Sequence, residues 1–214
     1  MKVLESSPSR YDRGIDLISL GQAGRIKKRI VDNEVIGNDR VLEIGCGTGT
    51  FAIMAAKKGT HVTGFDVSSA MLDVARKKVE KEALSDKIAL VEMGVSGMDS
   101  FEDSSFDLVV STLVFSELSP DERKYALQHS LRLLKPGGKL VLADEVKPDS
   151  FWRRFIHAVI RIPLTVFTYV LTQTTTRAVD GLKESVREAG FEIIKEERLL
   201  LGSFLYLVNK KEDA

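Results

Sequence analysis

The stretch of sequence that decides the fold is VLEIGCGTGT, which runs from Val41 to Thr50. An apolar run leads directly into glycines at positions 45, 47 and 49, and a helix is expected to begin near Thr50. Glycine permits a sharp turn and lets a ligand approach the backbone closely, and the N-terminus of a following helix offers free N–H groups. The pattern therefore predicts a nucleotide-type site at the carboxyl end of a first strand. The alternative is a tight strand–helix turn that binds nothing.

The residues around these glycines narrow the class of nucleotide. A dinucleotide fingerprint needs glycine where Thr50 stands, and no GKS or GKT follows as in a P-loop, so an NAD enzyme is disfavoured. Glu43, two residues before Gly45, would repel a pyrophosphate but suits a ligand that carries an ammonium or sulfonium charge. Asp66 follows Gly45 by 21 residues, at the expected end of a second strand. A carboxylate there can accept hydrogen bonds from both ribose hydroxyls of a nucleoside.

Short apolar runs alternate along the chain with amphipathic runs, which is typical of βαβ units and a parallel sheet. Seven strands are expected, at Arg40–Ile44, His61–Phe65, Ile88–Met93, Phe106–Ser111, Lys139–Ala143, Phe191–Glu196 and Phe204–Val208. Only Leu200–Ser203 separate the last two strands, which predicts that they pair antiparallel. The fold class is therefore α/β.

Three helices carry recognisable end signals. Ser68 is expected to cap one helix, and Ser119 with Glu122 forms the sequence of a capping box for a second helix, which should end before Pro136. A third helix, from about Val179 to Ala189, should stop at Gly190.

Composition excludes several classes of function. The 214 residues hold 31 Lys+Arg and 31 Asp+Glu, which suits one globular domain and argues against nucleic-acid binding, since that task usually needs a basic excess. Cys46 is the only cysteine, which excludes a Cys-based zinc cluster and fits a reducing cytoplasm. No metal site is expected, because the three histidines lie far apart. The first residues lack the apolar core of a signal peptide, and the apolar stretch 155–171 contains Arg161 and Pro163 and is not expected to span a membrane.

The sequence resembles the class I S-adenosylmethionine-dependent methyltransferases over residues 38–210. VLEIGCGTGTFA (41–52) is similar to their first motif and GFDVSSAML (64–72) to their second. SFDLVV (105–110) is similar to their fourth-strand motif, LRLLKPGGKLVLAD (131–144) to the segment leading into the fifth strand, and EAGFEI (188–193) to the entry of the sixth. The resemblance implies a Rossmann-like sheet in the order 3-2-1-4-5-7-6, with strand 7 antiparallel, helices on both faces and S-adenosylmethionine as cofactor.

The resemblance also implies roles for individual residues. Cofactor-binding residues are expected at Glu43, Gly45, Cys46, Gly47, Gly49, Asp66, Val67, Met71, Gly94, Val95, Ser111 and Thr112. The glycines would surround the methionine part, Glu43 would help to hold the loop and the amino group, Asp66 would bind the ribose, and Val67 and Met71 would flank the adenine. Many relatives have Asp where Val95 stands, so the adenine would be held here by stacking and by backbone groups near 94–96.

Substrate chemistry is expected after the fourth strand and at the start of the chain. Glu117 could act as a base or bind a cationic group, or be an exposed loop acid ahead of the Ser119 cap. Tyr11 resembles a tyrosine that closes over the cofactor in relatives, and could equally be a packing residue. Asp144 and Glu145 follow the expected fifth strand, where they would bind substrate or metal, or be solvated or hydrogen-bonded loop carboxylates.

Two basic segments complete the expected single domain, a helical N-terminal lid at 1–36 and a cap insert at 146–178. Arg10, Arg13, Arg25, Lys27, Lys28 and Arg29 mark the first, either as a solvated helix face that covers the sheet edge or as a lid over the site. Within the second, residues 151–177 hold four arginines and no acids. This part of the chain could line an apolar acceptor pocket, touch a membrane surface or dock a protein partner.

A finer resemblance links ESSPSRYDRGI (5–15), LVFSELS (113–119), LADEV (142–146) and RIPLTVFTYVLTQTTTR (161–177) to the corrinoid-protein-associated methyltransferases. It implies a corrinoid protein as partner. A broader resemblance, to the quinone-biosynthesis C-methyltransferases, favours an apolar acceptor. The sequence thus predicts in-line methyl transfer to a small apolar or corrinoid-linked acceptor. The alternative is a cofactor-binding accessory protein that docks on a corrinoid protein without catalysis.

Overall fold

The computed structural model describes residues 21–146, 178–199 and 202–211. Seven strands form one sheet in the order β3-β2-β1-β4-β5-β7-β6, as the resemblance implies. The strands are β1 (Arg40–Ile44), β2 (His61–Asp66), β3 (Ile88–Glu92), β4 (Phe106–Thr112), β5 (Leu134–Glu145), β6 (Phe191–Leu199) and β7 (Phe204–Lys211). The first five run parallel, and β7 lies antiparallel between β5 and β6.

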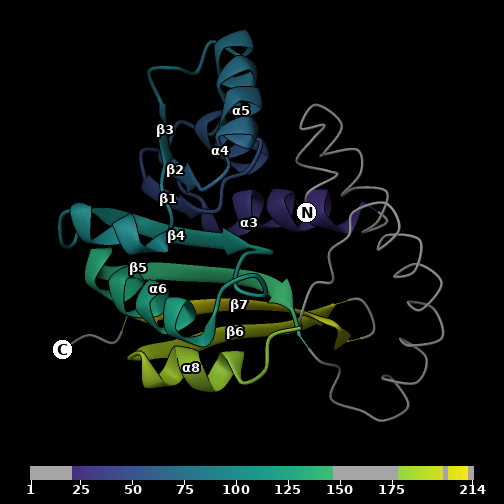
Figure 1. The fold of residues 1–214 in the computed structure, drawn as a ribbon, viewed down its shortest axis with the longest axis vertical. Helices are drawn as coiled ribbons and strands as arrows, with labels where there is room; N and C mark the ends of the chain where they lie inside the picture. The colour runs from purple at the N-terminus through teal and green to yellow at the C-terminus, as the bar shows by residue number, and fades with distance from the viewer. Residues whose placement is uncertain (1–20, 147–177, 200–201, 212–214) are drawn as a thin grey trace.

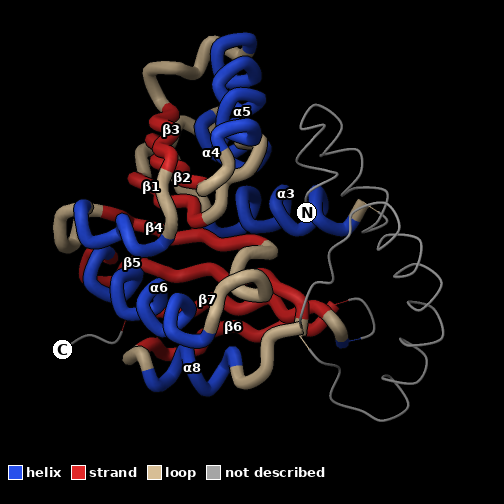
Figure 2. The backbone as a smooth tube through the Cα atoms, viewed as in Figure 1, coloured by secondary structure: helices blue, strands red, loops and turns tan. Residues whose placement is uncertain are grey.

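Helices cover both faces of this sheet (Figure 1). The helices of the described residues are α3 (Gln22–Glu34), α4 (Thr50–Ala56), α5 (Ser69–Lys81), α6 (Pro120–Leu133) and α8 (Leu182–Glu188), with a 3-10 turn, η1 (Val95–Ser100). Figure 2 shows the strands as a continuous layer, with α6 and α8 together over its β4–β6 part. Among these helices none is long and apolar enough to cross a membrane.

Alternation along the strands builds two apolar cores, one on each face. Successive strand residues point to opposite faces, so Leu42 and Val109 join the core under α6 and α8. Their neighbours Val41 and Val110 join the core under α3 and α4. Because helices cover both faces of the sheet, the sequences of the central strands are nearly continuous apolar runs.

The expected helix caps are present. The Ser68 hydroxyl accepts a hydrogen bond of 3.4 Å from the backbone N–H of Met71 at the start of α5. Ser119 and Glu122 form both bonds of the capping box, at 3.2 and 2.8 Å. Gly190, directly after the α8 region, has φ +92°, as expected for a glycine that ends a helix.

Two expected starts were wrong, and several strands end one to three residues away from the expected position. The fifth strand begins at Leu134 and not at Lys139, because Leu134 pairs with Phe106 of β4 across a register shift. The last helix begins at Leu182 and not near Val179. Val179 forms an isolated parallel β-bridge with Val146, and its N–H donates to the carbonyl of Glu145 at 2.8 Å. Residue 179 is therefore extended, and the helix starts only after Gly181.

Candidate active site

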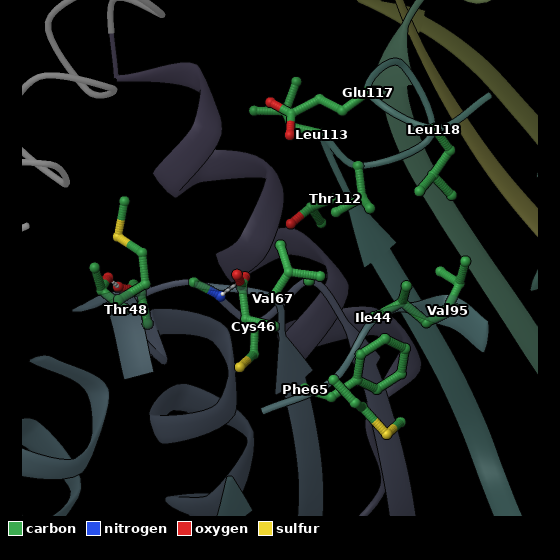
Figure 3. A pocket seen from close by; sticks show the side chains of 18 of the residues that line it. Ile44, Cys46, Thr48, Phe65, Val67, Val95, Thr112, Leu113, Glu117 and Leu118 are labelled. Atoms are coloured by element: carbon green, nitrogen blue, oxygen red, sulfur yellow. Dashed lines mark hydrogen bonds between the residues drawn. The ribbon is translucent and has the colours of Figure 1, made fainter. Parts of the chain in front are cut away.

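A cavity of about 390 Å³ opens at the carboxyl edge of β1, β2 and β4 (Figure 3). Ten of the expected site residues line it: Gly45, Cys46, Gly47, Asp66, Val67, Met71, Gly94, Val95, Thr112 and Glu117. They come from segments far apart in sequence, and parallel pairing brings the ends of their strands to one edge. Ten of the 22 residues that line the cavity are therefore ones that the sequence singled out.

The glycine loop turns sharply above β1. Gly45, Gly47 and Gly49 all have positive φ, at +69°, +52° and +73°. A Cβ on Gly45 would lie 2.3 Å from a methyl group of Val114, so the loop after β4 packs directly against this glycine. A Cβ on Gly47 would meet nothing within 4 Å, which leaves the backbone there open to a ligand.

Cys46 lies within this loop as a small buried residue. It packs against Gly64 of β2, where a Cβ would come within 2.8 Å of the Cys46 Cβ. Burial raises the pKa of the Cys46 thiol far above its ordinary value. The thiol therefore stays protonated and contributes packing rather than reactivity.

Asp66 joins the end of β2 to the glycine loop. Its Oδ2 accepts a hydrogen bond of 2.8 Å from the N–H of Gly47, and its Oδ1 accepts one of 3.0 Å from the N–H of Ser68. A carboxylate has about four acceptor positions, so each oxygen can still accept a second bond. The two backbone bonds orient a carboxylate that remains able to bind a ligand.

Glu43 carries a buried carboxyl group directly beneath the loop. Glu43 is 1% exposed, and neither oxygen of its carboxyl group has a hydrogen-bond partner. Burial raises the pKa of Glu43 to about 8, and the negative charge of Asp66 adds to the rise, while Lys27 and the backbone of Ala52 oppose it. A group of this kind is stabilised in its charged form by a cation placed nearby.

Four of the expected site residues do not line the cavity or cannot be placed. Glu43 lies below the loop, and Gly49 caps α4, where a Cβ would be 3.1 Å from the Cβ of Ala75. Ser111 is buried within β4. Tyr11 lies outside the described residues.

The segment after β4 forms the opposite wall. Leu113 has φ +61°, a conformation that is rare for a residue other than glycine, and its N–H donates to the carbonyl of Ala143 at 2.9 Å. The chain then turns so that Val114, Glu117 and Leu118 face the cavity. In Figure 3, Glu117 and Leu113 lie at the end of the cavity far from Phe65.

Asp144 holds this wall in place from β5. It is the penultimate residue of the strand and not part of a following loop, and it is 1% exposed. Its Oδ2 accepts a hydrogen bond of 3.3 Å from the N–H of Ser116. Burial raises the pKa of Asp144 to about 6, although hydrogen bonds from Ser116, Glu145 and Phe115 oppose the rise. Of the expected alternatives for Asp144, the hydrogen-bonded carboxylate is the one found.

Several lining residues had no motif to mark them. Ala23, Gly24 and Lys27 reach the cavity from α3, which thus both covers the sheet and closes part of the site. Met93 and Leu118 extend the apolar wall. In the sequence these residues look like ordinary core or surface residues of a helix or loop. Only the folded structure shows that they line the cavity.

Within the described part of the chain, no three His, Cys, Asp or Glu side chains gather as a metal site would need.

Comparison with known proteins agrees with this geometry. Residues 41–138 match the methyltransferase domain family. A demethylmenaquinone methyltransferase of Listeria monocytogenes is 32% identical over 211 residues, which cover 91% of this chain and 87% of the relative. The demethylmenaquinone methyltransferase of Lactiplantibacillus plantarum is 30% identical over 210 residues, or 90% and 87% of the two chains. The chain belongs to the class I S-adenosylmethionine-dependent methyltransferases.

The fold has solved counterparts. The geranyl diphosphate C-methyltransferase of Streptomyces coelicolor A3(2), solved with S-adenosyl-L-homocysteine, superposes with a TM-score of 0.67 at 14% identity, covering 88% of this chain and 76% of that one. The protein is a methyltransferase that uses S-adenosylmethionine as its cofactor.

The residues of the site fit this cofactor. The unpartnered carboxyl of Glu43 and the carboxylates of Asp66 and Glu117 make the surroundings of the cavity acidic, which suits a sulfonium cation. The open backbone at Gly47 admits a ligand against the loop. When bound, S-adenosylmethionine supplies an activated methyl group, and the protein mainly has to align the acceptor with it.

Proposed function

We propose that this methyltransferase methylates a ring carbon of an apolar, quinone-type acceptor. The proposal is supported by the names of the two relatives, which are about one third identical over most of both chains. The observation that carries it is the apolar wall opposite the glycine loop, built by Leu113, Val114 and Leu118. An apolar ring gains about 25 cal/mol for each Å² that such a wall removes from water.

In this proposal the cofactor lies along the carboxyl edge of the sheet. The methionine part sits against the glycine loop over Glu43, and Asp66 accepts hydrogen bonds from the ribose. Val67, Met71, Gly94 and Val95 bracket the adenine. Val95 is 6% exposed and packs in the core, so it offers an apolar contact where many relatives offer a carboxylate.

In this transfer the ring carbon would bond to the methyl carbon as the methyl–sulfur bond breaks and S-adenosylhomocysteine leaves. The ring carbon would then lose its proton, which restores the aromatic ring. We assign capture of this proton to Glu117, which is exposed and lines the cavity on the acceptor side. A reduced, hydroquinone-type ring is the nucleophile this chemistry needs, because its oxygens donate electron density to the ring carbon.

The test is transfer of a labelled methyl group from S-adenosylmethionine to reduced demethylmenaquinone under anaerobic conditions. Methylated quinone is expected with the wild-type protein. Glu117→Gln should lower the transfer rate about 100-fold or more, with the Kd for S-adenosylhomocysteine unchanged. Tight S-adenosylhomocysteine binding without methylation of any quinol would contradict the acceptor class. An unchanged rate in Glu117→Gln would contradict the role of Glu117.

The corrinoid resemblance stays a prediction. The relatives reported above are not named for a corrinoid, and the insert 151–177, which would carry such docking, lies outside the described residues. Residues 1–20 of the predicted lid at 1–36 lie outside them as well.

A further inference from the structure

The basic residues of α3 have separate surroundings. Lys28 is exposed and pairs with Asp32 along the helix at 2.5 Å. Arg29 pairs with Glu197 of β6 at 2.6 Å. Lys27, between Ile26 and Lys28, is half-buried and lines the cavity. Among the cavity-lining residues that the structure describes, Lys27 is the one side chain of positive charge.

Lys27 lies on the inner side of a helix that is held firmly. Residues three and four apart share a helix face, which groups Lys27 with Ala23 and Gly24 at the cavity and with the fully buried Ile30. Toward its C-terminal end, α3 is anchored through Glu34. Its carboxylate is 3.1 Å from the ammonium of Lys139 on β5.

Further contacts fix the same end of α3. The hydroxyl of Tyr206 on β7 donates to Glu34 at 3.4 Å. The ammonium of Lys58 donates to the carbonyls of Val31 and Val35, both at 2.8 Å. The backbone that carries Lys27 is therefore positioned by the sheet and by the segment after α4, and not by a ligand.

The glycine loop has already used several of its own donors. The N–H of Cys46 donates to Phe65 at 2.9 Å, that of Gly47 to Asp66 at 2.8 Å, and that of Gly49 to Cys46 at 2.9 Å. These three N–H groups are therefore already engaged, and a donor from another element would add to those that the loop can offer an anionic group. Helix α3 supplies one at the same cavity.

Two ionisable groups lie near the loop, the carboxyl of Glu43 and the ammonium of Lys27. Lys27 exerts the largest charge effect on Glu43, and it acts across space, because neither oxygen of Glu43 has a hydrogen-bond partner. The methionine part of the cofactor is a zwitterion, with an α-ammonium and an α-carboxylate. The carboxyl of Glu43 ionises more readily when a cation lies nearby and so suits the α-ammonium. The ammonium of Lys27 at the cavity suits the α-carboxylate.

We propose that Lys27 binds the α-carboxylate of the methionine part of the cofactor. The residue thereby distinguishes S-adenosylmethionine and S-adenosylhomocysteine from adenosine thioethers that lack the carboxylate. The N-terminal helix is thus part of the cofactor site and not only a cover for the sheet.

The test pairs a change in the protein with a change in the ligand, using calorimetry and no methyl acceptor. The ligands are S-adenosylhomocysteine and its decarboxylated analogue, which keeps the amine and loses the carboxylate. The wild type should bind the analogue about 10- to 100-fold more weakly than S-adenosylhomocysteine, because a charge-assisted hydrogen bond is lost. Lys27→Met should bind both ligands with the same low affinity. Removing the ammonium from the protein and removing the carboxylate from the ligand break the same interaction, so their effects should not add.

Two further variants complete the test. Lys28→Met, one residue along the same helix, should bind both ligands like the wild type. Lys27→Arg keeps the charge and should retain most of the preference for the carboxylate, which covers the case in which Lys27→Met folds poorly. If the wild type binds the two ligands equally, or if Lys27→Met keeps the full preference, the proposal is wrong.

Discussion

The carboxylate of Asp66 at the end of β2 accepts a 2.8 Å hydrogen bond from the N–H of Gly47 in the loop after β1. This bond joins two motifs that stand 19 residues apart in sequence. It orients the acid proposed to bind the ribose and closes the loop proposed to hold the methionine part. One side chain therefore couples the two halves of the cofactor site.

Asp66→Ala should weaken S-adenosylhomocysteine binding by roughly 10- to 100-fold, because both the ribose contact and the bond to the loop are lost. Calorimetry measures the effect. The control is Asp73→Ala on α5, an exposed acid that pairs with Arg76 at 2.9 Å and should leave binding unchanged. Binding by Asp66→Ala within twofold of the wild type would remove Asp66 from the site.

Gly45→Ala should destabilise the protein through both conformation and contact. The positive φ costs about 1–2 kcal/mol for a non-glycine residue, and the 2.3 Å approach to Val114 adds overpacking of about 1–3 kcal/mol. Gly137→Ala is the matched control, since Gly137 has φ +75° and a Cβ there meets nothing within 4 Å. Urea unfolding should show a clearly larger loss for Gly45→Ala, and equal losses would contradict the close packing at Val114.

The pKa of Glu43 predicts a pH dependence of stability. Burial raises this pKa from 4.5 to about 8, so between these values the folded protein holds a proton that the unfolded chain has released. The free energy of unfolding therefore falls as pH rises through this window, by about 1.4 kcal/mol per pH unit. Glu43→Gln cannot titrate and should lack this fall.

The window between pH 6 and 8 isolates Glu43, because the pKa of Asp144 is raised only from 3.8 to about 6. Urea unfolding of the wild type and of Glu43→Gln at several pH values tests the prediction, and the comparison cancels other groups such as His129. Parallel pH profiles for the two proteins would show that Glu43 is not buried as described.

Asp144→Ala should loosen the wall that faces the acceptor. Loss of the hydrogen bond from Ser116 is expected to speed amide exchange in residues 113–118 by about 5- to 10-fold. Exchange in the glycine loop, 45–49, should not change. Asp144→Asn keeps an acceptor oxygen and serves as the control. If mass spectrometry finds the same exchange in all three proteins, Asp144 does not position this segment.

Much of this structure could be predicted from local sequence. The strands before Gly45 and Asp66 and the capping box at Ser119 are set by residues within a few positions of one another, so their patterns are visible in the chain. The early start of β5 was missed because Leu134 is held by Phe106, 28 residues earlier. A partner that distant leaves no local pattern.

The sequence by itself determined the fold class, the order of the strands through the family motifs, the cofactor, and ten of the 22 residues that line the cavity. Tertiary structure alone decided that Lys27 faces the cavity while Lys28 faces solvent, and that Asp144 is a buried support for Ser116. The physical reason is that glycine conformation and strand periodicity are local properties of the chain. The surroundings of a charged side chain depend on which distant element packs against it, and only the folded protein fixes that.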